Sequence, residues 1–281
     1  MDNSVFLVVL LAALLHASWN ALVKNHKDKF LGLAAIVFGS VPWALILILY
    51  VPFPSDKAIP YIVLSAIIHN GYYWFLLSAY RFGDYTVVYP ISRGSGTILV
   101  ATVSLILFGV TLSNFELLGI FIVCLGIFSL SFQNSGELKK HKGIIYSLIT
   151  GVFIMSYSLT DGYGARISGS FLSYMAWLFP LEAILFLILL TIMKQRQIIN
   201  RISKNGKFIF FVGGSISTLV YITIVWGFTK APIPIITALR ETSIIFALLI
   251  GALLLNEKFT LLKTFAVLSI FFGVILLQFF S

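Results

Sequence analysis

The chain has 281 residues, of which 59% are hydrophobic and only 10% are charged, and its mean hydropathy is +1.03. A soluble domain could not cover its surface with so few charges, so the lipid bilayer must be the solvent for most of the chain. The formal net charge of +9 is dispersed over short connections between apolar segments. This dispersion favours anionic lipid headgroups, and not nucleic acid, as the partner of the basic residues.

Ten apolar segments are each long enough to cross a bilayer as a helix of about 20 residues. The first begins near the amino terminus, has no positively charged n-region and continues into polar residues, so we interpret it as an uncleaved span. Cys124, the single cysteine, lies in the fifth segment and excludes an internal disulfide. The sequence predicts an all-α membrane protein with spans at residues 4–23, 30–50, 58–80, 85–109, 115–133, 143–163, 170–193, 207–228, 233–255 and 260–280.

Lysine and arginine are distributed unevenly between the two sets of connections. Outside the spans, the odd-numbered connections carry 14 of these residues and the even-numbered ones carry 3. The positive-inside rule therefore places the odd-numbered connections in the cytoplasm and both termini outside. We expect a multi-pass protein of the cell's inner (plasma) membrane, either a monomer or a homodimer.

The two halves of the chain resemble each other. Residues 79–109 run parallel to residues 226–256 at an offset of 147, which aligns Arg93 with Arg240, and a weaker match at an offset of 141 sets Asn20 against Asp161. We predict a first five-helix repeat at 1–133 and a second at 143–281, joined by the polar loop 134–142. Because each repeat has an odd number of spans, the second is inverted relative to the first.

Inverted repeats place a binding site near the bilayer midplane and favour alternating access. Arg93 lies eight residues beyond Tyr85 and Arg240 seven beyond Ile233, which puts them about 12 and 10 Å deep at 1.5 Å per residue. Both are then near the centre of a hydrocarbon core of about 30 Å, where a charge costs at least ~2.5 kcal/mol. We therefore predict that Arg93 and Arg240 face a polar cavity and bind an anionic group.

The fourth span carries Pro90 and the run Gly94-Ser95-Gly96 beside Arg93. Proline removes a helical hydrogen bond, and small residues allow close approach of backbone or ligand. We expect a discontinuous helix that lines the site. The alternative is a face of small residues for helix packing.

Three acidic residues also fall within predicted spans. Glu241 could neutralise either arginine, bind an amino group or carry a proton, and a purely structural ion pair is the alternative. Asp161 is a second candidate for an amino group or a coupling proton, and we expect it near the interface. Glu182 has no assigned role beyond that of a candidate proton carrier.

Polar and aromatic residues complete the candidate site. His16, Trp19 and Asn20 share one face of the first span, although Trp19 could be an interfacial belt residue. Aromatic side chains with polar tips suit an organic solute, and they also suit ordinary packing. For contact with the body of the solute we select Tyr73, Tyr89 and Trp226.

Catalytic and cofactor motifs are absent from the sequence. Neither His16 nor His69 has a second metal ligand at i+3 or i+4, and no P-loop or GxSxG occurs. We expect no metal, no cofactor and no ATP hydrolysis.

The motifs HASWNALVK (16–24), YPISRGSG (89–96), DGYGAR (161–166) and LRETSIIFALLIGALLLNEKF (239–259) make the chain resemble the EamA-type members of the drug/metabolite transporter superfamily. The resemblance implies ten spans in two inverted repeats and secondary transport of small metabolites, often amino acids and commonly by export. It also implies that Asn256-Glu257-Lys258 is the acidic signature that closes the penultimate span. Many members keep both termini in the cytoplasm, whereas the loop charges of this chain indicate the opposite.

We therefore predict a secondary transporter of a small organic anion or zwitterion, such as an amino acid, organic acid or phosphonate. Its cavity is expected between spans one, three, four, six, eight and nine. One alternative is a membrane-embedded enzyme or lipid-handling protein that uses His16 and His69, and another is a structural or sensory protein whose arginines pair with acids. An exporter of lipophilic cationic drugs is opposed by two fixed positive charges.

Overall fold

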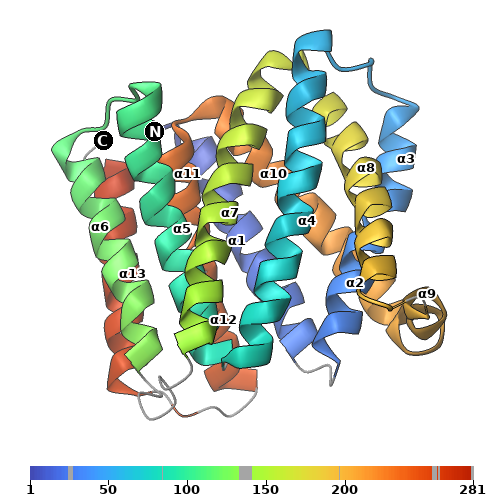
Figure 1. Ribbon diagram of the computed structural model, residues 1–281. Helices are drawn as coiled ribbons and strands as arrows, with labels where there is room; N and C mark the ends of the chain where they lie inside the picture. Colours follow the sequence, from blue (N-terminus) through green and yellow to red (C-terminus); the bar gives the residue numbers. More distant parts are fainter. Residues whose placement is uncertain are drawn as a thin grey trace.

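The computed structural model describes residues 1–24, 28–83, 85–132, 141–195, 197–254, 258 and 260–279. These residues form a bundle of helices and contain no strand (Figure 1). Ten helical segments among them are long and apolar enough to cross a membrane, which confirms the predicted all-α membrane class. Most of the predicted loop 134–142 lies outside the described residues, as do Asn256 and Glu257.

Seven of the spans are single helices, and two of these, α6 and α8, begin at side-chain caps. Ser113 and Glu116 form a reciprocal capping box at the start of α6, and the Ser170 side chain caps α8. Such caps satisfy backbone N–H groups that have no partner within the helix. The single-helix spans are α1 (Asn3–Lys24), α4 (Ile59–Phe82), α5 (Tyr85–Phe108), α6 (Asn114–Ser129), α7 (His141–Ile167), α8 (Phe171–Ile192) and α13 (Leu261–Phe279).

The second span, predicted as one helix, consists of α2 (Lys29–Gly39) and α3 (Val41–Ile48). Pro42 lies in the first turn of α3, where the missing N–H costs nothing because that group has no helical acceptor. A Cβ on Gly39 would lie 2.2 Å from the carbonyl oxygen of Phe210. The break therefore occurs where the second span closely approaches the eighth.

The eighth span begins in π-helical turns instead of a regular α-helix. A short helix, α9 (Ile198–Arg201), leads into the turns η3 (Ile202–Gly206) and η4 (Ile209–Gly213), and α10 (Gly214–Lys230) completes the span. In Figure 1, α9 lies at the lower end of the bundle and both termini lie at the upper end.

The discontinuous helix predicted in the fourth span is found in the ninth span instead. α5 continues through Pro90, which removes one helical hydrogen bond near the start of the helix. The ninth span divides into α11 (Ile233–Arg240) and α12 (Ser243–Leu254). At the break, the backbone N–H of Glu241 donates to Ala238 at 3.1 Å and that of Thr242 donates to Leu239 at 3.0 Å, so the chain tightens into 3₁₀-type bonds.

The Gly94-Ser95-Gly96 run packs against neighbouring helices. A Cβ on Gly94 would lie 2.9 Å from the Phe128 ring of α6, and one on Gly96 would lie 2.7 Å from Ile154 of α7. Here the helix-packing alternative is correct, and the expectation of a ligand-lining backbone is wrong. The small residues let α5 approach α6 and α7.

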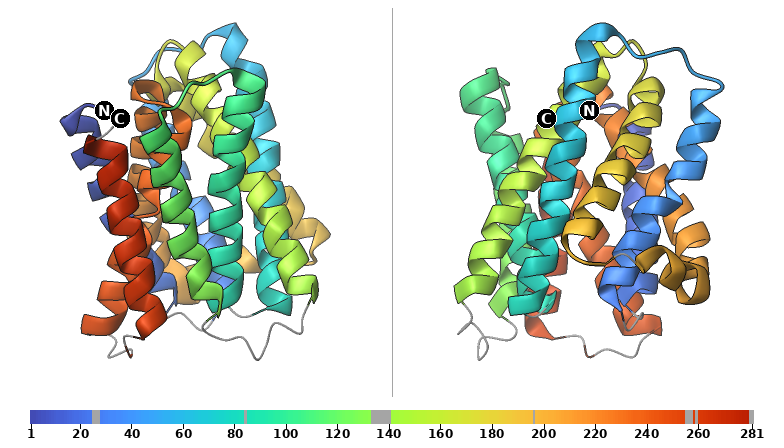
Figure 2. Two further views of the ribbon diagram at one scale, coloured as in Figure 1. Left: turned by 90° about the vertical axis from the view of Figure 1, so that its left-hand side faces the viewer. Right: turned by 45° about the vertical axis from the view of Figure 1, so that its right-hand side comes forward.

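Helices from the two halves of the chain contact each other throughout the bundle. α6 and α13 run side by side at one edge (Figures 1 and 2). A Cβ on Gly119 would lie 2.8 Å from the backbone oxygen of Gly273, and one on Gly126 would lie 3.0 Å from that of Ala266. Towards the middle, α4 packs on α7, α1 on α10, α5 on α7, and α1 on α12. These contacts surround the polar residues described next.

Candidate functional site

A cavity of about 420 Å³ lies inside the bundle. Its lining comes from α1, α4, α5, α7, α10 and α11, which belong to the six spans expected from the sequence. It also comes from the second span, through residues of α2 such as Leu33 and Val37, and from the seventh span, through Phe179 and Glu182 of α8. Eight of the ten spans therefore contribute to this one cavity.

Most of the predicted site residues line this cavity, and three do not. Glu241 and Asp161 are completely buried behind it, in contact with residues that do line it. Trp226 is half-buried and packs against the hydrophobic core, because α10 turns it away from the cavity. The lining residues from the predicted set are His16, Trp19, Asn20, Tyr73, Tyr89, Arg93 and Arg240.

Arg93 is paired with Glu241 across the two halves of the chain. Its Nη2 donates to Glu241 Oε1 at 2.7 Å and its Nε donates to Oε2 at 3.1 Å, a two-pronged arrangement. The Thr97 hydroxyl adds a hydrogen bond to Oε1 at 3.3 Å. Arg93 is only 6% exposed and Glu241 is 0% exposed. Good geometry and full pairing are what a buried ion pair requires.

Arg240 also lines the cavity, but it is not paired. Its Nε and Nη2 atoms are buried and have no hydrogen-bond partner among the described residues. Glu241 is adjacent in the chain, and yet its carboxylate is occupied by Arg93 and Thr97. The cavity therefore contains a buried cation whose donors are unsatisfied, which is costly without a ligand or water.

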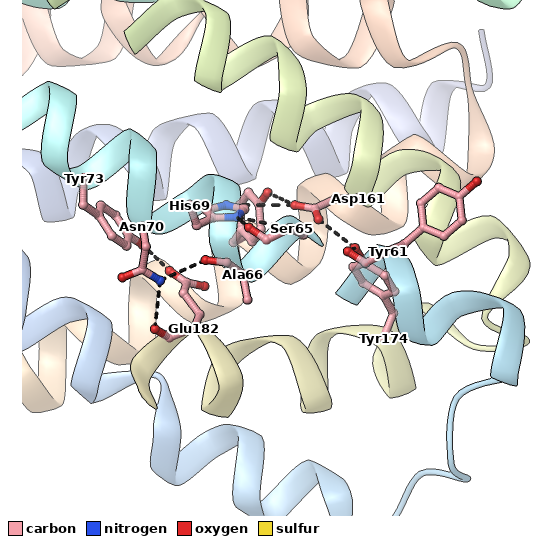
Figure 3. A network of polar contacts seen from close by, with 10 residues as sticks. Tyr61, Ser65, Ala66, His69, Asn70, Tyr73, Asp161, Tyr174 and Glu182 are labelled. Atoms are coloured by element: carbon pink, nitrogen blue, oxygen red, sulfur yellow. Dashed lines mark hydrogen bonds and ion pairs between the residues drawn. The ribbon is translucent and has the colours of Figure 1, made fainter. Parts of the chain in front are cut away.

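Asp161 lies inside the bundle and does not reach the interface as predicted. The Tyr174 hydroxyl donates to its Oδ1 at 2.9 Å, and the Tyr221 hydroxyl donates to its Oδ2. His69 Nε2 is 4.0 Å from the same Oδ2 (Figure 3). Because His69 and Tyr221 both line the cavity, Asp161 is one side chain removed from it.

Glu182, predicted only as a candidate proton carrier, faces the same cavity from α8. The Tyr73 hydroxyl donates to its Oε1. The Asn70 side chain donates to the Glu182 backbone oxygen at 3.1 Å and to Ala66 at 2.9 Å, which fixes α8 against α4 (Figure 3).

Aromatic rings form one wall of the cavity. His69 stacks on Tyr157 with centroids 4.4 Å apart and meets Tyr221 edge-on at 5.5 Å. Tyr72 meets Tyr157 edge-on at 5.5 Å. Such rings offer apolar faces to a carbon skeleton and polar tips to its substituents.

Two comparisons with known proteins bear on this arrangement. Residues 141–279 match the model of the EamA-like transporter family. The chain belongs to this family. It is therefore a membrane transporter of the drug/metabolite type, and its family is one of transporters and not of enzymes.

The fold of this EamA-like transporter is also found in a solved structure described only as "Crystal structure of protein". The TM-score is 0.77 at 16% sequence identity, and the match covers 100% of both chains. At this identity the likeness shows the fold alone. A comparison with curated protein sequences finds no match.

The chemistry available to the transporter is binding by charge, hydrogen bond and aromatic contact. Among the described residues, no group of three His, Cys, Asp or Glu side chains could hold a metal ion. Sequence reasoning missed Tyr157 and Tyr221 as lining residues. Tyr157 precedes Asp161 by four residues and so shares its helix face, and this was a usable signal. Tyr221 lies in an apolar segment that offers no such signal.

Proposed function

We propose that this transporter carries a small organic anion or zwitterion through the cavity by alternating access, with Arg240 as the residue that binds the anionic group. The observation that carries the proposal is the unpaired, buried guanidinium of Arg240 in the cavity lining. An unpartnered charge inside a low-dielectric protein is unfavourable, and a carboxylate or phosphate on the solute would supply the missing acceptors.

The other lining residues support an organic solute. Trp19 Nε1 is a second donor that has no partner among the residues described. The rings of Tyr72, Tyr157 and Tyr221 suit an apolar body, and Glu182 offers a carboxylate to an amino group. A lipophilic cation without an anionic group is disfavoured, because it would leave the donors of Arg240 unsatisfied.

The contacts between α6 and α13 support alternating access by two inverted repeats. At the offset of 147 residues, Gly119 is equivalent to Ala266 and Gly126 is equivalent to Gly273. Gly119 contacts Gly273, and Gly126 contacts Ala266. Each contact is thus the image of the other, as expected when a pseudo-twofold axis relates two repeats of opposite orientation.

The same correspondence between equivalent contacts is found for whole helices. The pairing of α5 with α7 has its counterpart in that of α12 with α1, and the pairing of α4 with α7 in that of α10 with α1. In the plasma membrane, the lysine-rich connections would face the cytoplasm and both termini would face outside.

The test is a ligand screen followed by transport. Purified protein is screened by thermal shift against amino acids, phosphonates and organic acids, because a ligand that binds the folded state raises its stability. The best compound is then followed in liposomes by counterflow. Arg240→Gln is expected to lower its apparent affinity by roughly 10- to 100-fold, the equivalent of a hydrogen bond to a charged group.

Arg81→Gln is the matched control, since exposed Arg81 lies at the end of α4 outside the cavity lining. Wild-type counterflow in Arg240→Gln would refute the proposal. Turnover of the compound to a new product in detergent would instead support a membrane-embedded enzyme.

A further inference from the structure

The buried charges around the cavity do not balance. Arg93 and Arg240 contribute two positive charges, and Glu241, Asp161 and Glu182 contribute three negative charges when ionised. With neutral histidines, this set of described residues has a net charge of −1, by the arithmetic +2 −3. A net charge is costly in a low-dielectric interior, so the cluster favours the uptake of one proton.

The geometry singles out His69 as the acceptor of that proton. Its Nδ1 lies 3.0 Å from the carbonyl oxygen of Ser65 and 3.1 Å from the hydroxyl of the same residue. Its Nε2 faces Asp161 Oδ2 at 4.0 Å. The protonated ring donates from both nitrogens, and it would have an acceptor at each: the Ser65 carbonyl at Nδ1 and, as an ion pair, the Asp161 carboxylate at Nε2 (Figure 3).

His16, the second histidine in the cavity lining, has the opposite surroundings. Its ring meets Trp19 edge-on at 5.1 Å, and no acid forms an ion pair with it among the described residues. His69 is instead on the side of the two acids that do not bind Arg93. The two histidines are therefore not equivalent, and the proton belongs on His69.

The groups that face His69 come from every helix packed around it. Three helices contact His69 directly: α4 with Ser65 and Tyr73, α7 with Tyr157 and Asp161, and α10 with Tyr221. α8 contributes indirectly, because its Tyr174 bonds to Asp161 and its Glu182 bonds to Tyr73. No cation is bonded to this group among the described residues. Arg93 and Arg240 share the cavity lining with His69.

We propose that His69 and Asp161 form a proton-binding site that is coupled to solute binding at Arg240. The coupling to solute binding rests on the proposed function, whereas the proton-binding site itself does not. Arg240 opposes protonation of His69, and an anionic group bound to Arg240 cancels that opposition. The solute and one proton, taken from water onto the His69 ring, therefore bind with positive cooperativity, and each raises the affinity for the other equally.

The experiment needs no ligand, because Arg240→Gln reproduces the neutralisation that a bound anion would cause. The full chain is labelled with ¹⁵N-histidine, placed in lipid nanodiscs and titrated by NMR, which separates imidazole from imidazolium. Loss of one signal in His69→Gln assigns it. At a fixed pH, Asp161→Asn is expected to lower the imidazolium-to-imidazole ratio of His69 about tenfold or more. Arg240→Gln is expected to raise the ratio roughly threefold.

Arg81→Gln is the control, and it should leave the ratio unchanged. Asp161→Asn could lose hydrogen bonds from two tyrosines and misfold, but Arg240 donates no hydrogen bond to the cluster, so its variant keeps the test decisive. An unchanged His69 ratio in Arg240→Gln overturns the coupling, and a His69 that never titrates overturns the proton site. Neither result depends on transport, whereas failure of the proposed function would appear as intact counterflow in Arg240→Gln.

Discussion

Arg93 and Arg240 occupy equivalent positions in the two halves of the chain, and yet their surroundings differ completely. Arg93 has a two-pronged partner in Glu241, whereas Arg240 has unsatisfied donors. The residue that follows Arg240 is Glu241, while the residue that follows Arg93 is Gly94. Consecutive residues on a helix point about 100° apart, so Glu241 faces away from its own neighbour and reaches the other half of the chain.

This difference shows how a repeated residue can serve two purposes. Glu241 follows Arg240 in the chain, but it neutralises Arg93 in the opposite half. The pair joins α5 to the break between α11 and α12, so it stabilises the contact between the halves. The unpaired arginine keeps its charge available for a ligand. Three predictions test this division, beginning with the largest expected effect.

Removal of Glu241 should destabilise the fold most. Glu241→Gln leaves Arg93 buried without a counter-ion, and loss of one partner from a buried pair typically costs about 3–5 kcal/mol. We expect a clear drop in the thermal unfolding temperature, measured by tryptophan fluorescence in detergent.

Arg240→Gln is the matched comparison for this stability measurement. Because its donors have no partners, its removal should leave stability unchanged or raise it. Equal destabilisation by the two variants would mean that both arginines are structural, and the distinction between them would fail.

The same Glu241→Gln variant should bind an anionic solute more tightly. With the acid removed, Arg93 becomes a second free cation in the cavity lining. One additional charged hydrogen bond contributes about 1.5–3 kcal/mol, which corresponds to a gain of roughly tenfold or more in affinity. Isothermal titration with the compound from the ligand screen measures this gain. A weaker affinity would indicate that the Arg93–Glu241 pair itself shapes the binding site.

The smallest effect is expected at two buried threonines near these arginines. Thr97→Val removes the hydroxyl that donates to Glu241, at a cost of about 0.5–1.5 kcal/mol. Thr237→Val is the control: Thr237 on α11 is 0% exposed and its hydroxyl has no partner among the described residues. Loss of the Thr237 hydroxyl should leave the free energy of unfolding unchanged or raise it. Comparable losses in both variants would show that the hydrogen bond to the ion pair adds nothing.

Much of the fold was predictable because hydrophobic length determines where a chain can cross a bilayer. The ten spans are where the patterns indicated, and seven of the ten predicted site residues line the cavity. The helix breaks were less predictable. Pro90, the stronger local signal, leaves α5 continuous, whereas the break at Glu241 has no proline or glycine beside it. It coincides with a side chain that bonds to the other half of the chain.

The sequence by itself determined the membrane class and the number of spans, because both follow from apolar length and a fixed rise per residue. Only the tertiary structure decided which arginine is paired, since Glu241 could have reached either. It also decided that Asp161 meets His69 and that Glu182 meets Tyr73. These residues are far apart in the chain, and their distances depend on how the helices pack. Partner choice between distant charges is a property of packing, and no local pattern records it.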